Sequence, residues 1–229
     1  MTPYYSEGGI TIYHGDCRVI VPQLAPVDLV VTDPPYGIGE ARGKNKSRNQ
    51  LALAKDYGTF DWDDRSPDEW VFGLFRVMSR WQIIFGGNYF PLPPSSCWLV
   101  WDKDNSGDFA DCELAWTNLP KAVRRLQWRW NGMLQQDMSR KEYRDHPTQK
   151  PLAVMKWAIL QAPDDCAVIL DPFMGSGTTL RAAKDLGRKA IGIELNERYC
   201  ETAAERLRQS ALEFAAPEIP VNAGLFGDA

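Results

Sequence analysis

Short apolar runs alternate with amphipathic stretches along this chain, and this alternation restricts the folds that it can adopt. The apolar runs predict strands at 10–14, 29–31, 83–85, 98–101, 122–130, 166–170 and 189–193, and the amphipathic stretches predict helices at 19–24, 66–80, 108–117, 148–161, 178–186 and 197–213. Strands that alternate with helices are typical of an α/β fold, in which helices cover both faces of one sheet. Ser66 is the expected cap of the second helix, because Pro67 and two acids follow it.

An acid, two prolines and an aromatic residue, Asp33-Pro34-Pro35-Tyr36, follow directly after the apolar run 27–32. Proline has a fixed φ angle and no backbone N–H, so Pro34 and Pro35 form a rigid turn that is poor in donors. The Asp33 carboxylate and the Pro34 carbonyl offer acceptors for an exocyclic amine, and the Tyr36 ring offers a flat stacking surface. The segment therefore predicts a pocket for a flipped nucleobase. The alternative is a strand that ends in a proline turn with Tyr36 on the surface.

A second motif, Asp171 to Thr179, follows the apolar run 168–170 and contains two glycines ahead of a helix that starts with hydroxyl residues. Glycine allows a close backbone approach, and free N–H groups at a helix start attract a carboxylate or a phosphate. A nucleoside triphosphate loop would end in Gly-Lys-Ser/Thr, whereas this loop has no lysine after Gly177. About one strand further on, Glu194 ends another apolar run at a spacing that is typical of an acid that holds ribose hydroxyls.

These two motifs, together with His146-Pro147-Thr148-Gln149-Lys150-Pro151, resemble the amino-methyltransferases of DNA. Because the tetrapeptide comes first and the glycine loop last, their order resembles the permuted beta-class arrangement of that family, and the resemblance covers most of residues 10–209. It implies a Rossmann-like methyltransferase fold, with a doubly wound and mostly parallel sheet, and S-adenosyl-L-methionine as the cofactor. The short chain also resembles compact phage and prophage enzymes that methylate adenine N6.

The resemblance also implies roles for individual residues. Asp33, Pro34, Pro35 and Tyr36 match the catalytic tetrapeptide, which holds and stacks the target base. The residues that match cofactor-binding positions are Asp16, Thr148, Lys150, Asp171, Phe173, Gly175, Ser176, Gly177, Thr178 and Glu194. Within this set, Asp16 matches the residue that meets the cofactor adenine, with a plain helix cap as the alternative. Glu194 matches the ribose acid, and Thr148 and Lys150 are candidate partners of the cofactor carboxylate.

The implied reaction is direct methyl transfer to an exocyclic amine of a base that is flipped out of double-stranded DNA at a specific site. Asp33 favours adenine N6, because members that methylate cytosine N4 more often carry serine at this position; cytosine N4 is the alternative target. Relatives that methylate RNA or a protein glutamine more often carry asparagine there. A non-catalytic DNA-binding regulator on the same fold is a further alternative, although Asp33, Gly175 and Gly177 are all present.

The net charge of −4 does not favour DNA binding, but the basic residues are concentrated in two segments. Residues 121–150 carry eight basic residues against three acidic ones, and residues 41–55 carry five basic residues and no acid. The expected DNA contacts are Arg42, Lys44, Lys46, Arg125, Trp128, Arg129, Arg140, Lys141 and Arg144. The alternative for the run 125–130 is tryptophans packed at a sheet edge, with arginines directed into solvent.

The expected organisation of these 229 residues, 44% of them hydrophobic, is a single catalytic domain (1–229) with a mobile loop at 37–65, an inserted DNA-recognition segment at 103–145 and a tail at 215–229. Because that recognition segment is small, we expect two subunits to share one DNA site as a homodimer. The chain has no run of ~20 apolar residues and no signal-peptide pattern, which predicts a cytoplasmic protein without a membrane partner. Five widely separated cysteines and two histidines predict buried thiols and no metal site.

Overall fold

The computed structural model describes residues 1–37, 66–104, 110–131, 134–139, 141–142 and 149–209. Nearly all of the loop expected at 37–65 and the whole tail expected at 215–229 lie outside these described residues. Among the helices that the structure describes, none is long and apolar enough to cross a membrane.

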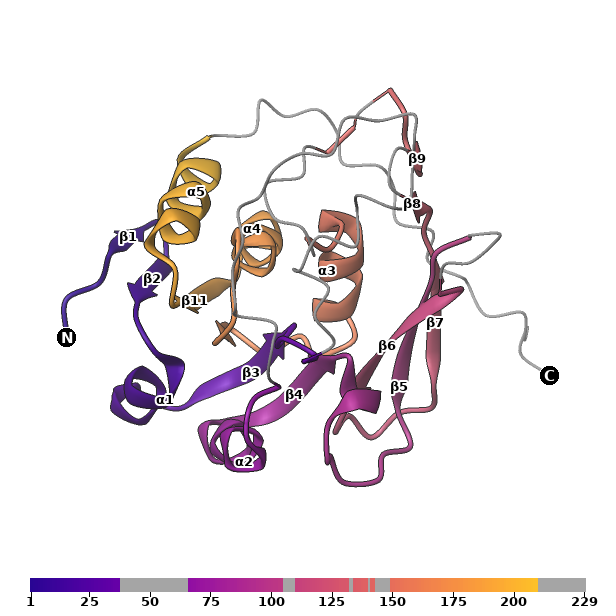
Figure 1. Cartoon of the computed structure of the whole chain (residues 1–229), viewed down its shortest axis with the longest axis horizontal. Helices are drawn as coiled ribbons and strands as arrows, with labels where there is room; N and C mark the ends of the chain where they lie inside the picture. The colour runs from indigo at the N-terminus through magenta and orange to yellow at the C-terminus, as the bar shows by residue number, and fades with distance from the viewer. Residues whose placement is uncertain (38–65, 105–109, 132–133, 140, 143–148, 210–229) are drawn as a thin grey trace.

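The described strands form one nine-stranded sheet and a separate two-stranded sheet (Figure 1). The large sheet has the order β1-β2-β11-β10-β3-β4-β6-β5-β7, and its strands are β1 (Tyr5–Glu7), β2 (Ile10–His14), β3 (Val27–Thr32), β4 (Ser79–Phe85), β5 (Trp98–Asp102), β6 (Cys112–Thr117), β7 (Arg124–Gln127), β10 (Val168–Asp171) and β11 (Lys189–Glu194). Its centre, from β2 to β4, is parallel, whereas β6 runs antiparallel to β4 and β5. β8 (Trp130–Asn131) and β9 (Leu134–Gln135) pair in the small sheet. The expected mostly parallel sheet is confirmed.

Helices cover both faces of the large sheet, as expected (Figure 1). α1 (Cys17–Ile20) and α2 (Glu69–Met78) lie on one face, and α3 (Leu152–Ile159), α4 (Thr178–Asp185) and α5 (Glu197–Arg208) lie on the other. Short 3-10 helices, η1 (Val21–Gln23) and η4 (Gly87–Tyr89), follow α1 and β4. Successive residues of one strand point to opposite faces, so Leu29 joins the core below α3 to α5 while Val30 joins the core below α1 and α2.

The parallel pairing of β3 with β10 joins two segments that are far apart in the sequence. Leu29 lies opposite Ile169, and Val30 lies opposite Leu170. Because the two strands are parallel, their carboxyl ends meet at the same edge of the sheet, where ligands of open α/β sheets bind. The chain therefore brings its first and its last motif together, although more than a hundred residues separate them.

The helix expected at 108–117 is wrong, because this segment contains strand β6. Its pairing with β4 on one side and with β5 on the other satisfies its backbone, and this tertiary context outweighs local helical preference. Ala115 and Trp116 belong to opposite core layers, as neighbours in a strand do. β6 and β7 also belong to the large sheet, so the segment 103–145 is not wholly an insertion.

Two helix starts also differ from their expected positions. α2 begins at Glu69, and its N-cap is Asp68 rather than Ser66, without a capping hydrogen bond from the side chain. α3 begins at Leu152 rather than at 148, after Pro151 at its N-cap. In both cases proline lies just ahead of the helix, where its missing N–H costs no intrahelical hydrogen bond.

The start of β10 is joined to β3 by a side chain as well as by the strand ladder. Asp28 Oδ2 accepts hydrogen bonds from the backbone N–H groups of Ala167 (2.9 Å) and Val168 (2.8 Å). We expect Asp28→Ala to lower the free energy of unfolding, measured by urea denaturation, by about 1–2 kcal/mol, because two backbone donors lose their acceptor. Asp28→Asn is the matched control, since it retains an acceptor oxygen and should lose much less. Equal losses in the two variants would contradict this account.

Candidate active site

A cavity of about 990 Å³ lies at the carboxyl edge of the parallel strands, lined by residues that end or follow β2, β3, β10 and β11. The expected site residues that line it are Asp16, Asp33, Pro35, Lys150, Asp171, Phe173, Gly175, Ser176, Thr178 and Glu194. Pro34, Tyr36 and Gly177 lie in the same two motifs, and Pro34 is buried. Thr148 lies outside the described residues. The structure thus brings nearly all of the described expected residues to one cavity.

Two glycines in the loop after β10 adopt backbone angles that other residues rarely adopt. The φ angle is +51° at Gly175 and +78° at Gly177, and Gly177 is the N-cap of α4. A Cβ atom at Gly177 would lie 2.7 Å from the Cβ atom of Ala203 in α5. The Gly175 N–H donates to Glu194 Oε2 over 3.1 Å. Glycine is therefore required here both by conformation and by the close approach of α5.

Glu194 ends β11 and presents a partly buried carboxylate to the cavity. Besides Gly175, the Asn196 N–H donates to this carboxylate, at 2.8 Å from Oε1. Burial raises the pKa of Glu194, and these backbone hydrogen bonds lower it in part. A carboxylate has about four acceptor sites, so Glu194 can still accept a hydrogen bond from a ligand hydroxyl. Its role as the ribose acid stays a prediction.

Asp171 connects the two motifs inside the sheet. Its side chain is 2% exposed, and its Oδ1 accepts hydrogen bonds from the Thr32 hydroxyl (2.8 Å) and from the Phe173 N–H (3.1 Å). Burial raises the pKa of Asp171 to about 7, although these hydrogen bonds favour the charged form. Since Thr32 directly precedes Asp33, Asp171 fastens the glycine loop to the strand that carries the tetrapeptide.

Tyr36 is held by Asp33 and by the segment after β4. Its hydroxyl donates to Asp33 Oδ1 over 2.7 Å. Its ring stacks on Tyr89, with the ring centres 4.9 Å apart and 17° between the planes. At Gly86, where φ is +66°, a Cβ atom would lie 2.1 Å from Tyr36 Cε1, so this contact requires glycine. Tyr36 is thus partly buried in an aromatic contact, unlike the surface tyrosine of the alternative interpretation.

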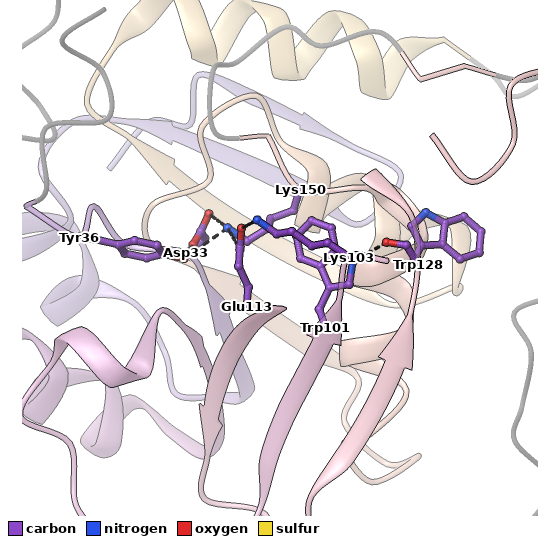
Figure 2. A network of polar contacts seen from close by, with 7 residues as sticks. All are labelled: Asp33, Tyr36, Trp101, Lys103, Glu113, Trp128 and Lys150. Atoms are coloured by element: carbon purple, nitrogen blue, oxygen red, sulfur yellow. Dashed lines mark hydrogen bonds and ion pairs between the residues drawn. The ribbon is translucent and has the colours of Figure 1, made fainter. Parts of the chain in front are cut away.

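Two lysines and two acids form a row that ends at Asp33 (Figure 2). Lys150 Nζ lies 2.5 Å from Asp33 Oδ2 and 3.1 Å from Glu113 Oε2. Lys103 Nζ lies 2.5 Å from Glu113 Oε1. The cofactor contact expected for Lys150 stays a prediction, because in this structure its ammonium group is bound by the two carboxylates.

Burial and ion pairing shift the pKa values of the side chains in this row in opposite directions. Burial raises the pKa of Glu113, but Lys150 and Lys103 outweigh it and bring this pKa to about 2. Burial lowers the pKa of Lys150, but Asp33 and Glu113 outweigh it and raise this pKa above the ordinary lysine value. At Asp33 burial prevails over Lys150, so the pKa of Asp33 is raised. Glu113 is therefore the more stable anion of the two acids.

Glu113 was not singled out by its position in the sequence. The helix expected at 108–117 gave no reason for the Glu113 side chain to face Lys150, whereas in β6 its Oε2 lies 3.1 Å from Lys150 Nζ. Gln149 and Arg206 are also unexpected: the Ser176 hydroxyl donates to Gln149 Oε1 (3.2 Å), and Arg206 Nη1 donates to the Ser176 carbonyl oxygen (2.6 Å). They hold the glycine loop through long-range contacts that local sequence patterns do not reveal.

Asp16 has the role of a helix cap. Its carboxylate accepts a hydrogen bond from the Arg18 N–H over 2.8 Å, at the start of α1, and pairs with the Arg18 guanidinium at 2.5 Å. The alternative interpretation as a cap is therefore confirmed. Because Asp16 also lines the cavity, its contact with the cofactor adenine stays a prediction.

The expected DNA contacts divide into three groups. Arg42, Lys44, Lys46, Arg140 and Arg144 lie outside the described residues. Arg125, Arg129 and Lys141 are exposed, and the first two form ion pairs with Asp102 and Asp104. Trp128 is 7% exposed and belongs to the core, and its carbonyl oxygen accepts a hydrogen bond from Trp101 Nε1 over 2.8 Å. For Trp128 the structure supports the packing alternative, because the residue is buried in the hydrophobic core.

Comparisons with known proteins agree on one family. Residues 95–205 match the family model described as DNA methylase. The type II methyltransferase M2.LlaDCHI of Lactococcus lactis subsp. cremoris is 28% identical over 91% of this chain and 93% of that protein. The DNA adenine methyltransferase YhdJ of Escherichia coli (strain K12) is 45% identical, but over only 34% of this chain and 26% of that protein.

Solved structures show the same fold. The crystal structure of the M1.HpyAVI–SAM complex matches with a TM-score of 0.52 and 28% identity, over 86% of this chain and 99% of that one. The PvuII DNA methyltransferase, which is cytosine-N4-specific, matches with a TM-score of 0.58 over 92% of this chain and 90% of that one. At 18% identity the PvuII match shows the fold alone.

The raised pKa of Asp171 predicts a stability that depends on pH. An unfolded aspartate titrates near ~4, whereas Asp171 titrates at about 7 in the folded chain, so between these values the folded state binds the extra proton. The free energy of unfolding should therefore fall, through this residue, as pH rises across this window. Asp171→Asn carries no charge and should gain stability relative to the wild type with rising pH, by up to about 4 kcal/mol. Urea denaturation of both proteins at about pH 5 and about pH 8 measures the difference in their free energies of unfolding. If this difference is the same at the two pH values, the prediction is refuted.

Proposed function

This chain belongs to the DNA methylase family of adenine-N6 and cytosine-N4 amino-methyltransferases, and we propose on this premise that it methylates N6 of adenine at a specific site in double-stranded DNA. One observation carries the proposal. Asp33 and the glycine loop that starts at Asp171 line a single cavity, with the Thr32 hydroxyl bound to Asp171 between them. A base-holding acid and a cofactor loop must lie this close for a methyl group to pass directly between two substrates.

The lining of the cavity suits S-adenosyl-L-methionine, which supplies a methyl group on a cationic sulfur when it is bound. The carboxylates Asp16 and Glu194 line the cavity, so that the protein presents negative charge to a cationic ligand. Phe173 and Ile193 add apolar surface, and the N-terminus of α4 at Thr178 attracts a carboxylate. Glu194 retains acceptor capacity for ribose hydroxyls. The size and the donor set of the site therefore fit this cofactor.

Asp33 is the residue to which we assign the target amine. An aromatic amine is a weak nucleophile, because its lone pair is delocalised into the ring. Hydrogen bonds from the amine to Asp33 and to the Pro34 carbonyl would localise this pair, and the carboxylate would stabilise the positive charge that develops on nitrogen. Tyr36, held by its hydroxyl bond to Asp33, would stack on the base.

Adenine is favoured over cytosine by two observations. Asp33 occupies the first position of the tetrapeptide, and a segment that makes up 34% of this chain is 45% identical to a DNA adenine methyltransferase. The alternative, cytosine N4, uses the same chemistry, and a cytosine-N4-specific enzyme has the same fold. A regulator without activity would not need the complete set of acids and glycines that meets in the cavity.

The proposal is tested by incubation of the purified protein with labelled S-adenosyl-L-methionine and unmethylated bacterial DNA, followed by digestion to nucleosides and mass spectrometry. We expect the label in N6-methyl-2′-deoxyadenosine. Label in N4-methylcytosine would retain the chemistry and change the target. Cofactor binding without any label in DNA would refute enzymatic DNA methylation and favour the regulator.

Asp33→Ala is the matched negative control for this reaction. It should lower the rate by about 100-fold or more, because the amine loses its charged acceptor, while calorimetric titration should show unchanged cofactor affinity. Thermal unfolding must be measured in parallel, since Asp33 also pairs with Lys150. A loss of cofactor binding in a folded variant would show that the site is assigned incorrectly.

We also propose that two copies of the chain act on one DNA site. The segment 103–145 is short for the specific recognition of a duplex by one subunit, and its described expected contacts Arg125, Arg129 and Lys141 are exposed. Light scattering of the protein on a duplex that contains its methylation site should give the mass of two chains per duplex. The mass of one chain per duplex would contradict the dimer.

A further inference from the structure

We infer that Glu113 is a positioning residue that receives the Lys150 ammonium group when the target amine takes its place at Asp33. The inference rests on the proposed function and adds a residue that the motifs do not include. Its starting point is that both oxygens of Asp33 are already in use. Oδ1 accepts the Tyr36 hydroxyl at 2.7 Å, and Oδ2 accepts the Lys150 ammonium at 2.5 Å.

The Lys150 ammonium and a methyl-accepting amine cannot both be stabilised by Asp33. A carboxylate can accept more than two hydrogen bonds, so space on Asp33 alone does not exclude the amine. Charge opposes it, because the amine hydrogens are positively polarised and the nitrogen becomes cationic while it gains the methyl group. A neighbouring ammonium ion in a poorly solvated cavity therefore repels the amine both when it binds and when it reacts. Lys150 is 8% exposed, so water cannot screen this repulsion effectively. For Asp33 to act on the amine, the Lys150 ammonium group must move away from Asp33.

Glu113 is placed to receive this charge. Its Oε2 is buried and lies 3.1 Å from Lys150 Nζ, yet among the described residues no donor meets it with hydrogen-bond geometry. A buried carboxylate oxygen without a hydrogen bond is costly, so a full bond from Lys150 would be favourable there. Lys150 lies between the two acids (Figure 2), so a change in its side-chain torsion angles that moves Nζ from Asp33 towards Glu113 exchanges one partner for the other.

On its other side, Glu113 is held by Lys103. Lys103 binds Glu113 Oε1 at 2.5 Å and lies 5.1 Å from the centre of the Trp101 ring. Trp101 is buried and donates from Nε1 to the Trp128 carbonyl oxygen at 2.8 Å. Glu113 is thus held by residues of β5 and by Lys103, which follows β5, and Lys150 is the cation that lies between the two acids. The row of two acids and two lysines stays neutral during the exchange, and only the partner of Asp33 changes.

The first test uses Glu113→Gln, which retains the shape of the side chain and removes its charge. Without the second acid, Lys150 should stay on Asp33 and compete with the amine. The probe is a duplex that carries the site methylated by the wild type, with either adenine or 2′-deoxynebularine at the target. The latter base lacks the exocyclic amine. Dissociation constants are measured with S-adenosylhomocysteine present, so that no turnover is needed. We expect the variant to bind the adenine duplex about tenfold more weakly than the wild type does, and the nebularine duplex with unchanged affinity.

A second variant separates this role from simple stabilisation of the fold. In Glu113→Gln/Lys150→Met the row is again neutral, and the cation that competes for Asp33 is gone. At a saturating concentration of S-adenosylhomocysteine, which compensates for the loss of any contact between Lys150 and the cofactor, this double variant should bind the adenine duplex within about threefold of the wild type. Asp185→Asn is the matched control, because Asp185 also pairs with two cations, Lys156 at 2.6 Å and Arg181 at 2.7 Å, at the far end of α4. It should leave both dissociation constants unchanged.

The outcomes are distinguishable. Equal weakening of both duplexes by Glu113→Gln, or no recovery in the double variant, would overturn the exchange and leave the proposed function intact. Loss of the difference between adenine and nebularine in Asp33→Ala, but not in Glu113→Gln, would also overturn it. A wild-type protein that methylates no DNA would remove the proposed function itself, and the exchange with it.

Discussion

The parallel pairing of β3 with β10 is the constraint on which the site depends. It places Thr32 beside Asp171, so that one buried hydrogen bond of 2.8 Å joins the tetrapeptide strand to the glycine loop. The sequence order of the two motifs has no influence on this geometry, because parallel strands end at the same edge whichever comes first in the chain. A permuted chain can therefore assemble the same cavity, provided that the two strands are neighbours in the sheet.

The acids at this cavity differ because their neighbours differ. Asp171 has only neutral donors near it, and burial raises its pKa to about 7. Glu113 has two lysines, which lower its pKa to about 2. Asp33 lies between these cases, with one lysine and a tyrosine hydroxyl, and its pKa is raised by burial. The site thus contains Glu113, which is a stable anion, and Asp33, whose carboxylate takes up a proton more readily. An exchange of Lys150 between the two acids requires this difference.

The sequence-based predictions were right for elements whose pattern lies within a short stretch of sequence. They were wrong for residues whose conformation or burial depends on strands that are distant in the sequence. The strands ending at Thr32, Asp171 and Glu194 were predictable, because apolar runs followed by acids or glycines are visible in the sequence itself. The segment 108–117 was not, because β6 owes its conformation to β4 and β5 on either side. Trp128 was misplaced on the surface for the same reason: an aromatic and basic run does not show which of its side chains the sheet covers.

By itself, the sequence determined the fold class, the motif residues and the glycines whose positive φ angles the loops require, since these depend on backbone sterics and on the hydrophobic pattern. Only the tertiary structure decided that Lys103 pairs with Glu113 and that Lys150 bridges the two acids Asp33 and Glu113. The physical reason is that ion pairs form between side chains brought together by strand order in a sheet. Strand order is set by packing of the whole chain, and no spacing along the sequence encodes it.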